Sequence, residues 1–413
     1  MRLMATAAMA CSLNLSTAHD MAGLTRLDSL HNIQPSPTNQ PKGEPLLKDV
    51  VGGRMAAQNY AHMEMQFNTS GQAQIADGKY AGGKFTVNGM KIQVSGQLSD
   101  NIGYMFRESF TKQPQKSTAD NLSTALEKAY VTWNVARDAK LVIGKQYIEI
   151  GGYEYWLSSN RIRFYSDFNA TVHCAQTGIG SYMSLSPGHT VALQLLTNSC
   201  ATNMDTYEYG FPETLRKSKT PVMGIIGYKG YFADRTFALH YGASYGQLAT
   251  NRQQMMLTAG HVYERGPVLA YLDVMYAREG IDTKGIISGC SEGYHGGNDG
   301  VAVGHTAQNV EYLSTIADID YRLSQQFNVY VKGVYETGRV YRANGIYQAG
   351  RYNDTWSLQA CVEYFPIRER DLRVFLHGVY KKTNLTQLGQ MVGGMPTDMA
   401  RVSVGIEYVL PVF

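Results

Sequence analysis

The feature that most constrains this chain is an alternation of apolar and polar residues with a period of two, which runs from residue 60 to the C-terminus with little helical pattern between. Near the C-terminus, for example, Val402, Val404 and Ile406 alternate with Ser403 and Gly405. Strands with one apolar face and one polar, mostly uncharged face are typical of a sheet that faces lipid on one side and water on the other. A soluble β-sandwich has the same alternation, so the period alone leaves both classes open. Similar alternation occurs over 61–68, 128–135 and 356–364.

The connections between the expected strands separate these two classes, because short turns alternate along the chain with longer segments rich in Gly, Asn and Ser. This order predicts a transmembrane up-and-down antiparallel β-barrel of 16 strands, with short periplasmic turns and long external loops. A sandwich mixes loop lengths at both ends, and an even strand number brings the last strand beside the first. The expected short turns are Ser99-Asp100, Arg137-Asp138, Pro187-Gly188, Ala233-Asp234, Gly266-Pro267, Ser324-Gln325 and Pro366–Glu369. The expected long connections are 75–83, 114–123, 150–174, 199–218, 249–251, 280–307, 341–353 and 385–398.

The composition agrees with an all-β membrane protein. Of the 413 residues 17% are charged, against about 25% in an ordinary soluble chain. No apolar run approaches the roughly 18 residues of a membrane helix, and the mean hydropathy is -0.26. The 29 tyrosines against 3 tryptophans suit a membrane interface, where the ring lies among headgroups and the hydroxyl stays wet. The net charge of +3 is too small to indicate a nucleic-acid partner.

The N-terminus indicates export. Residues 1–18 are expected to be a signal peptide, with Arg2 before an apolar stretch and the small residues Ser16-Thr17-Ala18 at the cleavage site. An apolar N-terminal strand or helix, or a lipoprotein modified at Cys11, are the alternatives. Residues 19–57 contain four prolines and no sustained period, which predicts a flexible periplasmic extension that could bind a periplasmic or outer-membrane partner. The barrel is then expected over 58–413.

The chain ends in an alternating strand with Tyr408 and a terminal Phe413. This ending resembles the signal by which bacterial outer-membrane barrels are recognised for assembly, although Pro411 departs from it. The expected location is the outer membrane of a Gram-negative bacterium, in contact with lipid and lipopolysaccharide.

The third long connection, 150–174, resembles a known family. Val142–Tyr147 runs into Gly151–Glu154, and Ser158-Ser159 and Phe164–Ser166 follow. This order is similar to the corresponding region of the phosphate-selective porin O and P family, most of all to its Bacteroidetes-type members. The resemblance implies a 16-stranded pore that assembles as a homotrimer. A third loop that folds into the barrel, as in general porins, predicts a pore constriction at Tyr155, Trp156, Arg161 and Arg163.

Strand parity predicts which charges face the lumen. The expected cationic wall residues are Arg107, Lys128, Lys332, Arg373 and Lys381. Acidic side chains have the same parity, at Glu64, Asp273, Asp318, Asp320, Glu336 and Glu363. A lumen of mixed sign does not predict a phosphate filter, because such a filter needs a local excess of cations. Only Arg161 and Arg163 suggest such an excess.

Cys174 and Cys200 flank the hairpin that turns at Pro187-Gly188, at nearly opposite positions. Export would allow a disulfide between them at the external rim, and two free thiols are the equal alternative.

The sequence does not predict an enzyme. No nucleophile-elbow, zinc-protease or phosphate-loop pattern occurs, and Ser288, His295 and Asp299 lie in a Gly-rich stretch where small polar residues are common. No cofactor and no metal are expected. The expected function is passive diffusion of small hydrophilic solutes or ions through an outer-membrane porin. The alternative is a structural or accessory outer-membrane barrel within a larger surface or secretion complex.

Overall fold

The computed structural model describes residues 61–112, 120–157, 161–202, 206–292, 304–367 and 371–412. The expected signal peptide over 1–18 and the expected extension over 19–57 lie outside these residues. In chain order the strands are β1 (His62–Ala76), β2 (Lys79–Gln97), β3 (Ile102–Ser109), β4 (Leu126–Ala136), β5 (Ala139–Tyr147), β6 (Ala175–Ser186), β7 (His189–Thr197), β8 (Val222–Phe232), β9 (Phe237–Ala249), β10 (Arg252–Arg265), β11 (Val268–Ile281), β12 (Gln308–Arg322), β13 (Phe327–Val340), β14 (Gly350–Tyr364), β15 (Asp371–Leu385) and β16 (Thr397–Pro411). The short helices are η2 (Glu154–Trp156), α3 (Asp167–Ala170), η3 (Ser199–Ala201), η5 (Ser288–Ser291) and α4 (Gln387–Met391).

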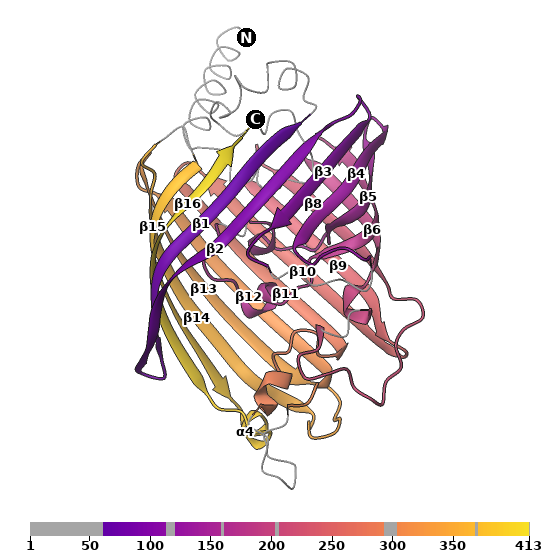
Figure 1. Cartoon of the computed structure of the whole chain (residues 1–413), viewed down its shortest axis with the longest axis vertical. Helices are drawn as coiled ribbons and strands as arrows, with labels where there is room; N and C mark the ends of the chain where they lie inside the picture. Colours follow the sequence, from indigo (N-terminus) through magenta and orange to yellow (C-terminus); the bar gives the residue numbers. More distant parts are fainter. Residues whose placement is uncertain are drawn as a thin grey trace, which may run out of the picture.

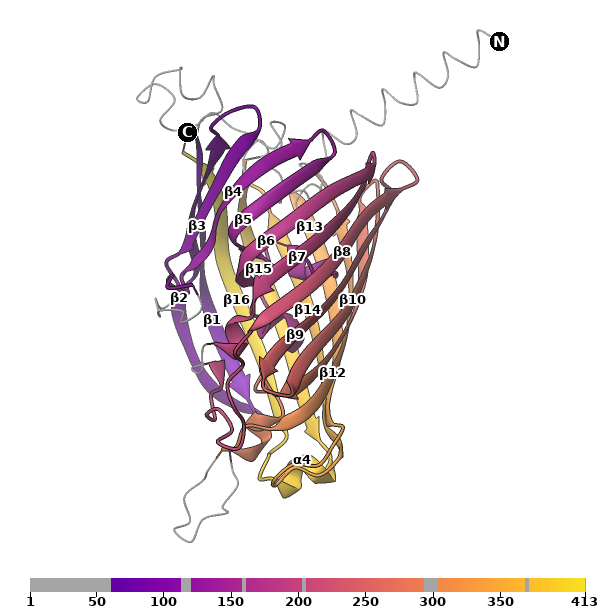
Figure 2. The same cartoon turned by 90° about the vertical axis from the view of Figure 1, so that its right-hand side faces the viewer.

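The strands form one closed antiparallel barrel, as the sequence predicts (Figures 1 and 2). Each strand pairs with its neighbours in the chain, and β1 pairs with β16 from Glu64 opposite Pro411 to Ala76 opposite Met399. The C-terminus lies at one rim, and α4 lies at the other (Figures 1 and 2). Because β1 pairs with β16, the sheet is closed and has no first or last strand with an unpaired edge. A sheet must be closed in this way to span a membrane.

The burial pattern of the strands is the reverse of that in a soluble protein. In β16 the side chains of Val402 and Val404 are 54% exposed, whereas Ser403 and Glu407 are buried. In β14 Leu358 is likewise 54% exposed, between buried polar neighbours. A sandwich would bury the apolar face of each strand, so this inversion excludes that class and indicates an outer surface made for lipid.

Two of the expected long connections are tight turns, so the predicted alternation of short and long connections is wrong at these two places. The chain reverses at Asp77-Gly78 between the paired residues Ala76 and Lys79. Both turn residues have positive φ, 47° and 72°, as the common two-residue hairpin turn requires. The glycines of the expected 75–83 loop therefore belong to β2. A second tight turn at residues 250–251 replaces the expected connection over 249–251.

The wall of the barrel is uneven in height, because the strands differ in length. Strands β3–β8 have 8 to 12 residues, and β9–β16 have 13 to 15. β2 is longest, with 19 residues. The short strands lie toward the rim of the C-terminus, so the part of the wall formed by β3–β8 is shorter than the rest (Figure 1).

The main apolar cluster lies inside the barrel and is built by the connection between β5 and β6, which we call the inner loop (residues 148–174). Ile148, Ile150, Tyr153 and Phe168 of this loop are 1% exposed each and pack against inward residues of β8–β13. The rings of Tyr153 and Tyr271 (β11) lie 4.9 Å apart. The inner loop thus has a core of its own against one wall. In the described part of the chain no helix is both long and apolar enough to cross a membrane.

Candidate functional site

Glycines allow the inner loop to enter the barrel in contact with the strand backbone. The Gly151 amide donates to Thr258 Oγ1 (β10) at 2.6 Å. A Cβ on Gly151 would lie 2.5 Å from the carbonyl oxygen of His240, and one on Gly242 would lie 2.4 Å from the Gly151 nitrogen. Gly152 has a φ of 95°, which favours glycine. The Gly-Gly pair is therefore required by close backbone approach.

Asp273 of β11 holds the next turn of the inner loop. Its carboxylate accepts the backbone amide of Tyr153 at 2.7 Å and that of Glu154 at 2.8 Å. These amides open the short helix η2, whose first N–H groups have no partner within the helix. The carboxylate therefore supplies the partners that the helix lacks.

Glu154 is the buried centre of the inner loop. Its carboxylate accepts hydrogen bonds from Lys332 Nζ (β13) at 2.7 Å, Ser166 Oγ at 2.6 Å and Asn169 Nδ2 at 2.6 Å. Burial alone would raise the pKa of this carboxyl, but Lys332 and the hydrogen bonds outweigh burial and lower the pKa. Glu154 is therefore held as a carboxylate that ties both halves of the loop to β13.

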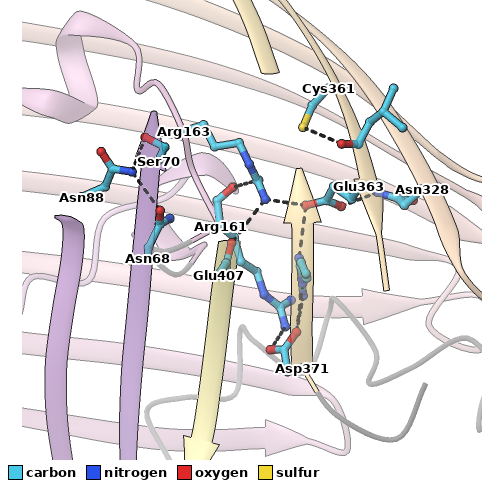
Figure 3. Close-up of polar contacts among 12 residues, drawn as sticks. Asn68, Ser70, Asn88, Arg161, Arg163, Asn328, Cys361, Glu363, Asp371 and Glu407 are labelled. Atoms are coloured by element: carbon cyan, nitrogen blue, oxygen red, sulfur yellow. Dashed lines mark hydrogen bonds and ion pairs between the residues drawn. The ribbon is translucent and has the colours of Figure 1, made fainter. Parts of the chain in front are cut away.

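The two expected constriction arginines are paired with the wall (Figure 3). Arg163 Nη2 lies 2.9 Å from Glu363 Oε1 (β14) and 3.3 Å from Glu407 Oε2 (β16). Arg161 Nη2 lies 3.2 Å from Asp371 Oδ2 (β15). The positive charge expected from these arginines is thus balanced by buried or half-buried carboxylates, and the pairs attach the loop to the last strands of the barrel.

The two expected aromatic residues of the constriction make contacts within the inner loop. Tyr155 Oη donates to the Ile148 carbonyl at 3.1 Å, and Trp156 Nε1 donates to the Ile150 carbonyl at 2.8 Å. Their rings meet edge to face at 5.1 Å. Both residues therefore fix the shape of the loop.

Three of the expected wall cations also hold the inner loop or its partners. Lys332 binds Glu154, and Lys381 Nζ donates to Asp167 Oδ1 at 2.5 Å. Arg373 lies 2.8 Å from Asp371, the partner of Arg161. The structure thus brings these cations together with the loop on one side of the lumen.

The other two wall cations belong to a second group on and beside β2–β4, which we call the basic cluster (Lys91, Arg107, Lys112 and Lys128 around Glu127). Glu127 lies 2.9 Å from Lys91 Nζ, 3.2 Å from Arg107 Nε and 2.9 Å from Lys112 Nζ. Lys128 Nζ lies 4.6 Å from the centre of the Tyr147 ring. Four cations against one carboxylate give +4 − 1 = +3.

Glu64 lies beside the basic cluster and reduces its charge. Gln66 donates to Glu64 at 2.8 Å and accepts from Arg107 at 3.3 Å. With Glu64 included the local charge is +4 − 2 = +2. The described wall around Glu127 thus has a local cation excess, at a different place from the arginines that the sequence singled out.

Sequence reasoning missed Lys91 and Glu127 because the strand of each has a bulge, and in β4 Arg107 pairs with Lys128 and Glu108 with Leu126, so that Glu127 is the extra residue. Lys112 lies beyond the end of β3. β2 has a bulge, because Asn68 pairs with Gly89 and Thr69 pairs with Val87. The extra residue moves Phe85 and Lys91 to opposite faces although both have odd numbers. In the sequence, this change of face is indicated only by the Gly-rich stretch that lies beside the bulge.

Of the two alternatives for Cys174 and Cys200, the structure has the two free thiols. The ladder between β6 and β7 has the register that would place them opposite each other, but its last pair is Gly178 with Leu196. Asn198 then caps the helix η3 and accepts the Cys200 amide at 3.1 Å. Cys200 therefore turns into a separate apolar cluster with Tyr207 and Leu248.

The hypothetical nucleophile at Ser288 has a structural role. Its hydroxyl donates to Asp282 Oδ2 at 2.7 Å and accepts the Ala307 amide at 3.0 Å. His295 and Asp299 lie outside the described residues. Within the described ranges no group of His, Cys, Asp and Glu side chains is placed to hold a metal ion.

A closed barrel with an apolar outer surface and a polar lumen that holds an anchored loop defines a porin-type transmembrane barrel. The family model described as phosphate-selective porin O and P matches residues 62–410, and the chain belongs to this family. It is an outer-membrane protein of the Gram-negative type that forms a channel for passive diffusion.

Solved porins share this fold. The chain is similar to the outer membrane channel DcaP of Acinetobacter baumannii, with a TM-score of 0.55 and 11% identity over 85% of this chain and 97% of that one. An anion-selective porin from Comamonas acidovorans has a TM-score of 0.51 and 9% identity over 84% and 99%. OmpT of Vibrio cholerae, in a trimer form, has a TM-score of 0.50 and 12% identity over 84% and 98%. At these identities the likeness shows the fold alone. No curated protein matches the sequence.

Proposed function

We propose that this porin passes small hydrophilic solutes between the inner loop and the wall of the basic cluster, and that it favours small anions over cations. The single observation that supports this proposal is the difference in charge balance between the inner loop and the basic cluster. The arginines of the inner loop are matched by Asp371, Glu363 and Glu407, whereas the basic cluster retains an excess. Excess cations along a narrow pore attract anions and repel cations.

The proposed selectivity is modest and extends to no particular anion. Glu127 lies within 3.2 Å of three of the cations, so their field is partly cancelled. Phosphate recognition, which the family description names, would need cations whose hydrogen bonds are directed to the ligand. Lys91 directs its hydrogen bonds to Glu127 instead, at 2.9 and 3.0 Å.

The proposal is tested first by conductance. Purified protein in planar bilayers is expected to give discrete ohmic steps in KCl. A folded barrel that stays silent across salts and voltages would support the accessory role instead, in which residues 19–57 bind a partner. We propose no chemical step and no cofactor.

We also propose a homotrimer. OmpT of Vibrio cholerae has a trimer form, and a free strand edge supports the same assembly here. From Lys79 to Gly89 β2 pairs with β1, but β3 pairs only with Lys91 to Gln97. Phe85 on this edge is 94% exposed among the described residues. A strand edge without a paired neighbour among the described residues, with an exposed aromatic side chain on it, is normally covered by protein. A second copy of the chain would cover it.

A further inference from the structure

Charged side chains lie together on the outer face of the barrel, near the rim of the long loops. Arg278 (β11) is paired with Glu311 (β12), which is paired with Arg339 (β13), so the three lie side by side at one level of the wall. Along their strands Arg278 and Glu311 have the parity of the exposed Leu272 and Leu313. Paired residues share a face of the sheet, so all three side chains point away from the lumen.

The carboxylate of Glu311 lies beneath the two arginines. Its Oε1 is 3.6 Å from Arg278 Nε, its Oε2 is 3.5 Å from Arg339 Nε, and the Tyr276 hydroxyl donates to Oε1 at 3.0 Å. The Glu311 side chain is 14% exposed, against 49% for Arg278 and 57% for Arg339. The surface therefore presents guanidinium groups, and the covered carboxylate orients them.

The same arrangement is repeated on β14. Arg351 is paired with Arg339, and its Nη1 lies 3.2 Å from Asp354 Oδ1. The Arg351 side chain is 56% exposed and that of Asp354 is 23% exposed, and the Tyr335 hydroxyl donates to Asp354 at 2.9 Å. We call Arg278, Glu311, Arg339, Arg351 and Asp354 the outer patch. Its charge is +3 − 2 = +1, with the cations outermost.

Aromatic side chains indicate the depth of the outer patch in the membrane. Trp356 is paired with Tyr335 across β13 and β14, and its ring lies 5.2 Å from that of Tyr380. Such residues concentrate at the membrane–water interface. Toward the middle of the wall the outward residues Val331 and Leu358 are apolar and exposed. The outer patch lies on the loop side of the aromatic row, and therefore in the headgroup layer of the external leaflet.

The arginines of the outer patch have donors available for a ligand. Arg278 and Arg339 turn their Nε atoms toward Glu311, and the described residues form no hydrogen bond with their Nη atoms. Arg278 is also held in place by the Tyr341 ring, whose centre lies 3.9 Å from Cζ. Guanidinium groups with free N–H donors match the geometry of a phosphate.

We propose that the outer patch binds the phosphate group of a lipid A-type glycolipid in the external leaflet. The phosphate would accept hydrogen bonds from the arginines, and the acyl chains would lie along the apolar wall below the aromatic row. Basic side chains at this depth recognise anionic lipid headgroups. The outer patch does not border β2, so subunits that associate at the edge of β2 would leave it in contact with lipid.

The test is native mass spectrometry of the full-length folded protein in mild detergent, titrated with phosphorylated lipid A. A chelator prevents divalent cations from bridging phosphate and carboxylate. Lipid A without its phosphates is expected to bind at least about tenfold more weakly, the equivalent of one charge-assisted hydrogen bond. Arg278→Gln with Arg339→Gln should weaken binding of phosphorylated lipid A by the same factor and leave binding of the dephosphorylated lipid unchanged.

The matched control removes two exposed arginines near the rim of the short turns, Arg137→Gln with Arg265→Gln, and should leave binding unchanged. Should the double variant of the outer patch fail to fold, Arg339→Gln alone replaces it, because Arg278 still covers Glu311. A loss of at least about threefold is then expected, which is half of the same free energy.

Several results would overturn this inference. Wild-type protein that binds no lipid A, dephosphorylated lipid A that binds as tightly as the phosphorylated form, or an outer-patch variant with undiminished binding would each do so. Inorganic phosphate that displaces lipid A at equal concentration would make the outer patch a site for a free anion. A variant that changes the number of subunits and not lipid binding would make it an interface between copies. Because no current is measured, failure here leaves the proposed conduction untouched.

Discussion

Arg163 of the inner loop and Glu363 of β14 form a buried ion pair of 2.9 Å, with side chains 3% and 4% exposed. The pair joins the loop to a wall 200 positions further along the chain. It therefore fixes the path of the loop through the lumen, and several consequences of this arrangement can be measured.

Arg163→Gln is expected to release the middle of the inner loop, because Glu407 would then lie buried without its cation and Glu363 would keep only Arg373, at 3.4 Å. Breaking a buried pair by removing one partner costs about 3–5 kcal/mol. The loss would appear as faster proteolysis within the inner loop and as larger open-channel noise, while the barrel remains closed. Arg137→Gln, at a short turn, is the control. A quiet channel with a protected loop in Arg163→Gln would contradict the assigned pairing.

Acid is expected to loosen the inner loop through Glu154. Its pKa is lowered in the folded protein, so its stabilising contribution is full above the ordinary pKa of 4.5 and is lost as the pH falls through the lower folded value. The protection factors of the inner-loop amides, which compare the measured exchange rates with the intrinsic rates at the same pH, should therefore be constant from pH 7 to about 5 and fall at lower pH.

Glu154→Gln supplies the control for the acid effect. It has no carboxylate to gain a proton or to bind Lys332 as an ion pair, so its loop amides should have lower protection factors than wild type at neutral pH and show little further change in acid. An acid response in Glu154→Gln equal to that of the wild type would place the titrating group elsewhere.

Phe85→Asp is expected to weaken subunit association by placing a charge on the free edge of β2, where Phe85 is 94% exposed. Native mass spectrometry in mild detergent should then show monomers where the wild type gives trimers. Met395→Asp alters a 77% exposed apolar side chain in a loop and should stay trimeric. Trimers of undiminished stability in Phe85→Asp would remove this edge from the interface.

Cys200 is expected to be a protected thiol. Burial raises its pKa to about 12, so at neutral pH it is protonated and inaccessible. Maleimide should label Cys200 only after unfolding, and no reductant should be needed for labelling. Recovery of a peptide in which Cys174 and Cys200 are linked would contradict the register break at Asn198.

The sequence was sufficient to predict the barrel, because alternation and turn spacing are local properties. The face of β14 predicted to be apolar, with Leu358 and Val362, is the exposed face in the structure. The hairpin at Asp77-Gly78 is not predicted by the sequence, because the glycines of β2 are equally typical of a loop. Both errors in loop length arise from turn residues that also occur in long loops.

The site was predicted less completely, since it depends on contacts between distant segments. Arg163 and Glu407 are 244 positions apart, and nothing local in the sequence shows that they meet. Strand parity predicts that Arg107 and Lys128 face the lumen. It does not predict this for Lys91, because the bulge in β2 changes the parity of that strand. The ladder of β6 and β7 could be extended to Cys174 and Cys200, but the end of that ladder at Asn198 could not be predicted.

The most direct test of the account is the reversal potential of single channels in a KCl gradient. The basic cluster predicts a potential displaced toward the chloride equilibrium value, and Lys91→Gln with Lys128→Gln should reduce the displacement. Phe164 and the other inner-loop residues are unchanged in this variant, so the conductance steps should persist. A wild-type reversal potential at zero or on the potassium side would contradict the proposed cation excess in the pore.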